Sequence, residues 1–204
     1  MNAQPQHTVI ISPLGDIDDL LLKTIRMQID RIFAFGTEIR PLLKSIEFAH
    51  DTERDQYYST QILQRLDELA PSHALKVLAV VQGDLFIPIL THVYGEAQLG
   101  GRSCVVSTHR LGLNLPPSGH LQTYQDRISK ETIHELAHTF SLRHCKDRAC
   151  IMHYCRSIRD VDQKSHQLCR YCRTMLADEL RRLETRNRIM DSDRTAADRL
   201  ASRK

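Results

Sequence analysis

The residues best suited to chemistry lie in the segment HELAHTFSLRHC, residues 134–145. His134 and His138 are four positions apart, so on a helix their imidazoles leave from the same face, one turn apart. Two imidazoles at that separation can bind one zinc ion at nitrogen–metal distances of about 2.0–2.1 Å. Glu135 adjoins the first ligand and can take a proton from a zinc-bound water without binding the metal itself. The H-E-x-x-H spacing therefore predicts a catalytic type of zinc site.

A third histidine, His144, follows His138 by six residues. It can complete the site only if the chain turns sharply after the second ligand. Three protein ligands leave a fourth position open for water, which is the geometry of a catalytic rather than a structural zinc site. The alternative is a solvated helix with scattered histidines. The third histidine and a following methionine, Met152, make the zinc site the better interpretation.

Five of the six cysteines fall within residues 145–172. They include two closely spaced pairs, Cys145 with Cys150 and Cys169 with Cys172, which together can close a tetrahedral zinc site. Four thiolates leave no open position, so this metal would be structural and would clamp the loop after the histidines to the last helix. The alternatives are free thiols or a redox pair at the second pair of cysteines.

The two remaining cysteines have different surroundings. Cys155 lies between the pairs, and spacing alone leaves it open as a competing ligand. Cys104 falls in an apolar, strand-like segment, where we expect an ordinary buried thiol. The N-terminal residues do not have the basic and apolar regions of a signal peptide, so we expect a cytoplasmic protein. In that compartment a cysteine cluster favours metal binding over disulfides.

Strand-like and helix-like segments alternate through the N-terminal half. Apolar runs predict strands at residues 8–12, 74–81 and 103–109, and one more strand near 88–95. Apolar residues at helical spacing predict helices over about 17–32 and 58–69. This alternation is typical of an α/β sheet with helices packed on it. The strand near 88–95 is a candidate edge on which an extended peptide could align.

The second half is expected to carry the site on helices. The histidines belong to a predicted helix over residues 126–140, and a cysteine-rich irregular stretch follows. The last helix is expected to start near Ser165, with a buried stripe formed by Leu168, Cys172, Leu176, Leu180 and Leu183. We therefore expect one domain over residues 1–186. The tail, residues 187–204, has mixed charge and few large apolar residues, and we expect it to be disordered.

The composition is that of an ordinary globular protein. Its 204 residues suit a single domain with a substantial core. No apolar run reaches the length of about 18 residues that a membrane span needs. The formal net charge of +3 is too small to imply nucleic acid, and arginines near the cysteines are more simply a solvated face (Arg156, Arg159, Arg170 and Arg173). We expect a monomer that binds neither nucleic acid nor membrane.

These motifs resemble those of the archaemetzincin family of metzincin zinc metallopeptidases. The family pattern is H-E-x-x-H-x-x-G, a third histidine after two intervening residues, an adjoining cysteine, C-x4-C-x-M and a later C-x-x-C. The resemblance extends over most of residues 8–185 and includes segments 54–63 and 83–111. The matching residues are His134, Glu135, His138, His144, Cys145, Cys150, Met152, Cys169 and Cys172.

The resemblance implies a metzincin-like α/β (α+β) fold. That fold has a mixed twisted sheet with packed helices, an active-site helix and a small zinc-clamped C-terminal subdomain. The upper subdomain would cover about 7–144 and the lower about 145–186.

The family also implies hydrolysis of peptide bonds in a peptide or protein substrate. The reaction would use a water bound to a three-histidine zinc ion and a glutamate general base. Two zinc ions per chain would be bound, one catalytic and one structural. Met152 would be the Met-turn methionine beneath the metal, unless it is an ordinary buried loop residue.

The chain departs from the family pattern in one place and adds a tyrosine in another. Ser141 stands where metzincins have glycine, at a positive-φ turn that returns the third histidine to the metal. A serine there costs about 1 kcal/mol, which zinc binding of about 10 kcal/mol or more can offset. Tyr154 is placed as in astacin-like metzincins, where such a tyrosine can bind zinc or steady the oxyanion; ordinary packing is the default. Ser141 also motivates an alternative function, a zinc-stabilised peptide- or protein-binding module with a weak or vestigial hydrolytic site.

Overall fold

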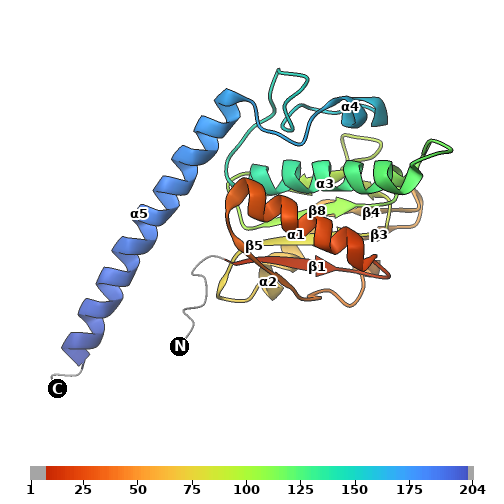
Figure 1. Cartoon of the computed structure of the whole chain (residues 1–204). Helices are drawn as coiled ribbons and strands as arrows, with labels where there is room; N and C mark the ends of the chain where they lie inside the picture. Colours follow the sequence, from red (N-terminus) through yellow and green to blue (C-terminus); the bar gives the residue numbers. More distant parts are fainter. Residues whose placement is uncertain (1–7, 202–204) are drawn as a thin grey trace.

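A mixed five-stranded sheet forms the centre of the molecule (Figure 1). The computed structural model describes the backbone of residues 8–201 and the side chains of residues 8–185. The strand order is β2-β1-β5-β8-β7, in which only β7 runs antiparallel to its neighbour. The strands are β1 (Thr8–Pro13), β2 (Gly36–Ile39), β5 (Ala74–Val81), β7 (Gly95–Ala97) and β8 (Ser103–Ser107). β7 is therefore an edge strand.

Helices cover both faces of this sheet. α1 (Asp19–Phe33) and α3 (His120–Thr139) pack on one face, and α2 (Ser59–Leu69) packs on the other (Figure 1). Successive side chains of a strand point to opposite faces, so the central strands contribute to both cores. In β1, for example, Val9 and Ile11 pack with α1 and α3, whereas Ile10 packs with α2. The α/β architecture predicted from the alternating segments is confirmed.

A second, small sheet supports the segment that leads into β7. It contains β3 (His50–Asp51), β4 (Gln56–Tyr58) and β6 (Leu85–Phe86). Arg54 donates to the carbonyl of Leu90, and Gln56 donates to the carbonyl of Thr91. The predicted strand near 88–95 is displaced: these residues form turns and an isolated bridge, and the edge strand begins at Gly95. Two 3₁₀ turns, Glu47–Ala49 and Arg110–Gly112, complete this half.

The C-terminal part contains α4 (Ile158–Gln163) and α5 (Arg170–Ala201). Figure 1 shows α5 in blue, slanting away from the sheet layers. Leu176 is buried in its first half, and Leu180 and Leu183 pack partly buried against the core, as the predicted stripe requires.

The tail differs from its prediction. The sequence predicts disorder from residue 187, but in the structure the helix continues to Ala201. No proline or glycine interrupts 170–201, and arginine, leucine, alanine and glutamate favour helix. Residues 202–204 lie outside the described part.

Two predicted helix boundaries shift as well. α3 begins at His120 rather than at 126, and α5 begins at Arg170 rather than near Ser165. Gly119 precedes α3 in a left-handed conformation, which ends the preceding turn and lets the helix start early. No helix among the described residues combines the length and apolar character needed to cross a membrane.

Candidate metal centres and active site

His134 and His138 lie on one face of α3, as their spacing predicts. Their Nε2 atoms are 3.1 Å apart. Two nitrogens bound to one tetrahedral zinc ion at the usual distances are separated by about 3.3 Å. His134 is buried and His138 is half-buried. The pair is therefore spaced and oriented to share a metal ion.

Backbone carbonyls fix the orientation of both imidazoles. Nδ1 of His134 donates to the carbonyl of Ile151 at 2.8 Å, and Nδ1 of His138 donates to the carbonyl of Leu142 at 2.6 Å. These bonds place the proton on Nδ1 and leave the Nε2 lone pair for a metal. Burial lowers the pKa of His134 well below its usual value and that of His138 to about 4. Both imidazoles are therefore neutral, as metal ligands must be.

A tight turn after α3 brings His144 to the same place. Ser141 adopts φ +64°, and its N–H and that of Gly100 both donate to the carbonyl of His138 at 2.9 Å. The ring of His144 then lies 4.8 Å from that of His138, measured between centroids. The donor atoms of the three histidines all lie within 4.8 Å of one another. The serine thus takes the left-handed conformation for which glycine is the usual residue.

Glu135 lies against the edge strand. Gly95 allows this close approach, because a Cβ at that position would be 2.6 Å from Cγ of Glu135. Burial raises the pKa of Glu135 well above its usual value, and the nearby Glu131 adds to the effect. A carboxyl group shifted in this direction is suited to exchange protons near neutral pH.

These groups line a cleft of about 860 Å³. One wall is β7 with the segment before it, including Leu90 and Val93. The histidines and Glu135 form the floor, and the residues after the third histidine form the other wall. In that wall the ring of Tyr154 lies 4.8 Å from the ring of His144, between centroids, and is 40% exposed. The cleft has the size of a peptide-binding site.

A buried ion pair lies next to His134, and the sequence pattern does not predict it. Nζ of Lys164 lies 2.6 Å from a carboxylate oxygen of Glu131 and 3.5 Å from Nδ1 of His134. The side chains of Lys164 and Glu131 are only 0% and 4% exposed. Glu131 is one helical turn before Glu135, a spacing that could have marked it. Lys164 is a single lysine at the end of α4, and nothing in its local sequence distinguishes it.

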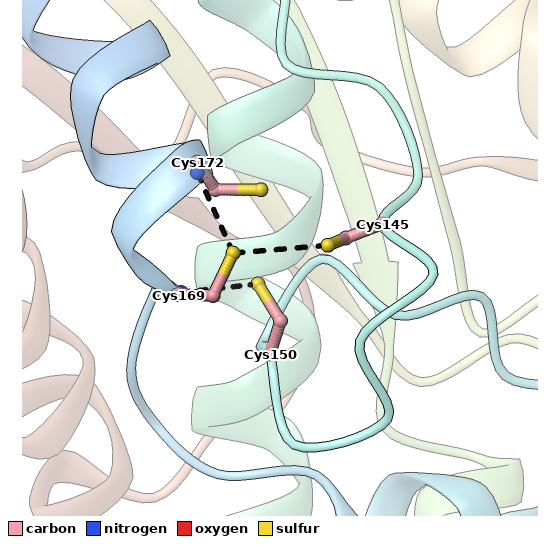
Figure 2. A group of neighbouring side chains, drawn as sticks. All are labelled: Cys145, Cys150, Cys169 and Cys172. Carbon is pink, nitrogen blue, oxygen red and sulfur yellow. Dashed lines mark hydrogen bonds between the residues drawn. The ribbon is translucent and has the colours of Figure 1, made fainter.

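The four predicted cysteine ligands gather at the start of α5 (Figure 2). Sγ of Cys145 lies 3.8 Å from Sγ of Cys169. Two sulfurs on one tetrahedral zinc ion, each at about 2.3 Å from the metal, are also separated by about 3.8 Å. The N–H of Cys169 points to Sγ of Cys150 at 3.3 Å, and the N–H of Cys172 points to Sγ of Cys169 at 3.5 Å. The donor set therefore fits a closed zinc site.

The thiols are free, and two of them resist ionisation. No disulfide joins the cysteines of the described chain. Burial raises the pKa of the Cys150 and Cys172 thiols above the ordinary value. A bound cation would favour the thiolate form of all four sulfurs and offset this effect of burial.

The other predicted residues fall into clear places. Cys155 belongs to neither metal group within the described residues, and it lines the cleft. Cys104 is fully buried in β8, as expected. Met152 is fully buried, and its carbonyl accepts a hydrogen bond from the N–H of Cys145 at 2.8 Å. The residue before it, Ile151, supplies the carbonyl that orients His134. One short segment thus touches both metal groups.

Comparison with known proteins agrees with this geometry. Residues 20–178 match the model of Peptidase family M54. The archaemetzincin of Methanocaldococcus jannaschii is 34% identical over 173 residues, which cover 83% of this chain and 93% of that protein. The archaemetzincin of Methanopyrus kandleri is 40% identical over 136 residues, which cover 67% of this chain and 74% of that protein.

Solved structures are similar over most of the chain. The crystal structure of the Methanopyrus kandleri archaemetzincin gives a TM-score of 0.75 at 30% identity, over 89% of this chain and 99% of that one. The Archaeoglobus fulgidus archaemetzincin, solved in complex with malonate, gives a TM-score of 0.70 at 28% identity, over 82% and 99%. The chain therefore belongs to Peptidase family M54, and it is a zinc metallopeptidase of the archaemetzincin type.

Proposed function

We propose that the protein hydrolyses peptide bonds at a catalytic zinc ion held by His134, His138 and His144, with Glu135 as general base. A second zinc ion, held by the four cysteines, is structural, which makes two per chain. The observation that carries the proposal is the pair of Nε2 atoms 3.1 Å apart, each on a ring whose Nδ1 is engaged by a carbonyl, in the cleft that contains Glu135. Bound zinc would supply a Lewis acid that lowers the pKa of a water in the open position.

The remaining chemistry belongs to residues of this chain. Glu135 takes the proton of the attacking water and passes it to the leaving amine, which its position on the cleft floor allows. Met152 forms a buried apolar support under the histidines. The hydroxyl of Tyr154 is a candidate donor to the developing oxyanion, with packing against His144 as its simpler role.

The edge strand offers a place for the substrate backbone. Among residues 8–201, β7 pairs with β8 alone, and its three residues line the cleft. An extended peptide can add to such an edge through main-chain hydrogen bonds. The carboxylate of Glu96, in the middle of β7, accepts hydrogen bonds from Ser59 at 2.6 Å and from Thr60 at 2.9 Å. This carboxylate is therefore engaged by α2 and does not act as a free charge on the substrate.

Replacement of Glu135 by glutamine tests the mechanism. We expect Glu135→Gln to lower kcat by roughly a thousandfold or more, because proton transfer is lost, while metal analysis still finds two zinc ions per chain. Glu68→Gln, a surface change on α2, is the matched control and should retain full activity. Undiminished turnover in the Glu135→Gln protein would sink the proposed mechanism.

A second candidate function is a zinc-stabilised peptide- or protein-binding module with a weak or vestigial hydrolytic site. The left-handed conformation of Ser141 is the observation that favours it. One zinc ion per chain, held by the cysteines, would support this function. Two zinc ions, with activity lost to a chelator and restored by zinc, would support the peptidase.

As a peptidase, the protein acts on a peptide or protein substrate. The division into subdomains at residues 144 and 145 stays a prediction. So do the monomeric state, the cytoplasmic location and the expectation that neither nucleic acid nor membrane is a partner.

A further inference from the structure

We infer that the cleft selects peptides with a carboxylate on the leaving-group side of the scissile bond, and that Arg156 binds this carboxylate. The inference rests on the proposed peptidase function and adds a substrate class to it. The carboxylate can come from an acidic side chain or from the C-terminus of a short leaving fragment. The chemistry of recognition is the same in both cases, and the experiment below separates them.

The exposed charged side chains that line the cleft are positive. Two arginines line it, Arg143 and Arg156, and no carboxylate among the side chains described for residues 8–185 forms an ion pair with either. The acidic residues of the lining are all engaged or buried. Glu96 accepts hydrogen bonds from two hydroxyls, Glu131 pairs with a buried ammonium, and Glu135 is buried on the floor. An incoming carboxylate thus meets unpaired guanidinium groups and no competing free acid.

Arg156 is held beside the third histidine. Its guanidinium carbon lies 5.9 Å from the centroid of the Tyr154 ring, and that ring packs on His144. Its backbone N–H donates to the carboxylate of Asp160 at 3.0 Å, which fixes the start of the side chain. A guanidinium is planar and can donate two parallel hydrogen bonds to one carboxylate. The side chain is exposed, so those donors remain available to a ligand in the cleft.

The position of Glu135 in the cleft and the residues next to it assign Arg156 to the leaving-group side. Glu135 delivers a proton to the leaving amine, so the leaving group lies on its side of the metal. One turn earlier on α3 is Glu131, which lines the cleft together with Cys155. Arg156 directly follows Cys155 and also lines the cleft, so we assign Arg156 to the part of the cleft on the Glu135 side of the metal.

Binding of uncleaved peptides tests the inference without relying on turnover. The zinc-loaded full-length protein with Glu135→Gln is titrated with three matched peptides whose cleavage site has been mapped in the active protein. The first has glutamate after the scissile bond and an amidated C-terminus, the second has glutamine there and the same amide, and the third has glutamine and a free C-terminus. We expect the first or the third to bind about three- to tenfold more tightly than the second, as a partly exposed charge pair allows. Tighter binding of the first peptide would mean that the carboxylate belongs to an acidic side chain. Tighter binding of the third would mean that it belongs to the C-terminus of the leaving fragment.

Variants of Arg156 assign the effect to this residue. Arg156→Gln in the same background should abolish the gain, and Arg156→Glu should make a lysine peptide the preferred ligand. Arg159→Gln, which removes an equal charge on α4 outside the cleft lining, should keep the gain. In the active protein the preference should appear in KM rather than in kcat.

Each contrary result has a distinct meaning. Equal Kd values for the three peptides overturn the inference and leave the peptidase function standing. A gain that survives Arg156→Gln overturns the assignment to Arg156. Failure of the unsubstituted protein to bind or cleave any peptide overturns both the proposed function and this inference.

Discussion

The two metal groups meet at adjacent residues, His144 and Cys145, and yet they are built in opposite ways. The histidines project from one long helix and the turn after it, and backbone carbonyls orient the first two rings. They open onto a cleft of about 860 Å³. The cysteines come from a loop and from the beginning of α5, and their four sulfurs face one another (Figure 2). Three donor side chains beside a cavity would leave a metal ion an open position for a reaction, whereas four donors would leave room only for the metal.

The cysteine group supports the histidine group. The N–H of Cys145 donates to the carbonyl of Met152, and the neighbouring carbonyl of Ile151 orients His134. The loop that carries the first cysteine pair therefore also supplies a contact to the first histidine. We therefore expect substitutions in the cysteine group to lower zinc affinity at the histidines as well. Substitutions in the histidine group should leave zinc binding by the cysteines unchanged.

The largest effect is expected from Cys172→Ser. Loss of one thiolate should release the structural zinc and lower the free energy of unfolding by about 3 kcal/mol or more. Zinc affinity at the histidines should fall as well, because the loop around Cys145 loses its anchor. Zinc per chain and thermal unfolding measure both effects. Cys155→Ser, a cysteine in neither group, is the control, and retention of two zinc ions by the Cys172→Ser protein would contradict the assignment.

His138→Ala should produce the reverse pattern. Loss of one of three ligands should remove the catalytic zinc and abolish activity, while the cysteine zinc remains. Compared with the unsubstituted protein with no zinc at the histidines, stability should change by only about 1 kcal/mol, because the side chain is half-buried and its hydrogen bond to Leu142 is local. Metal analysis should find one zinc ion per chain. Loss of both metals would mean that the two groups depend on each other equally.

Gly95→Ala should disturb the active site without changing any of the three histidines. The new Cβ would lie 2.6 Å from Cγ of Glu135 and 2.7 Å from the carbonyl oxygen of Val105, so the strand or the glutamate must move. We expect kcat/KM to fall by about 10- to 100-fold with two zinc ions retained, because misplacement of a catalytic group is costly. Gly112→Ala, which faces Tyr124, is the control. Unchanged kinetics would show that Glu135 need not lie where the structure has it.

The smallest effect is expected from Ser141→Gly. Glycine removes the strain of a left-handed serine but adds entropy to the unfolded chain, so the net gain should be roughly 0.5–1 kcal/mol. Thermal unfolding of the zinc-loaded protein measures this gain, and activity should be retained. A loss of stability would indicate that the serine makes a compensating contact that glycine cannot make.

The sequence is most informative where chemistry follows local spacing. The i, i+4 histidines, the adjoining glutamate and the paired cysteines require no knowledge of distant contacts, and the structure brings both ligand sets together. The α/β alternation likewise follows from apolar periodicity. The pair of Glu131 and Lys164 cannot be predicted in this way, because its partners are far apart in the chain and meet only through tertiary packing.

Element boundaries are predicted less well. The sequence places the edge strand near 88–95, but side-chain hydrogen bonds from the small sheet hold that segment in turns, and pairing with β8 starts at Gly95. The prediction for the tail beyond 187 rests on its charge, whereas the absence of helix breakers determines the helix that the structure gives up to Ala201.

The order of the ligands along the chain has a consequence for biosynthesis. All three histidines leave the ribosome before Cys169 and Cys172 do. Until that last pair arrives, the loop with Cys145 and Cys150 has only half of its thiol partners, and the carbonyl that orients His134 belongs to an unanchored segment. A nascent chain therefore organises the active site fully only after the segment with Cys169 and Cys172 has been translated as well.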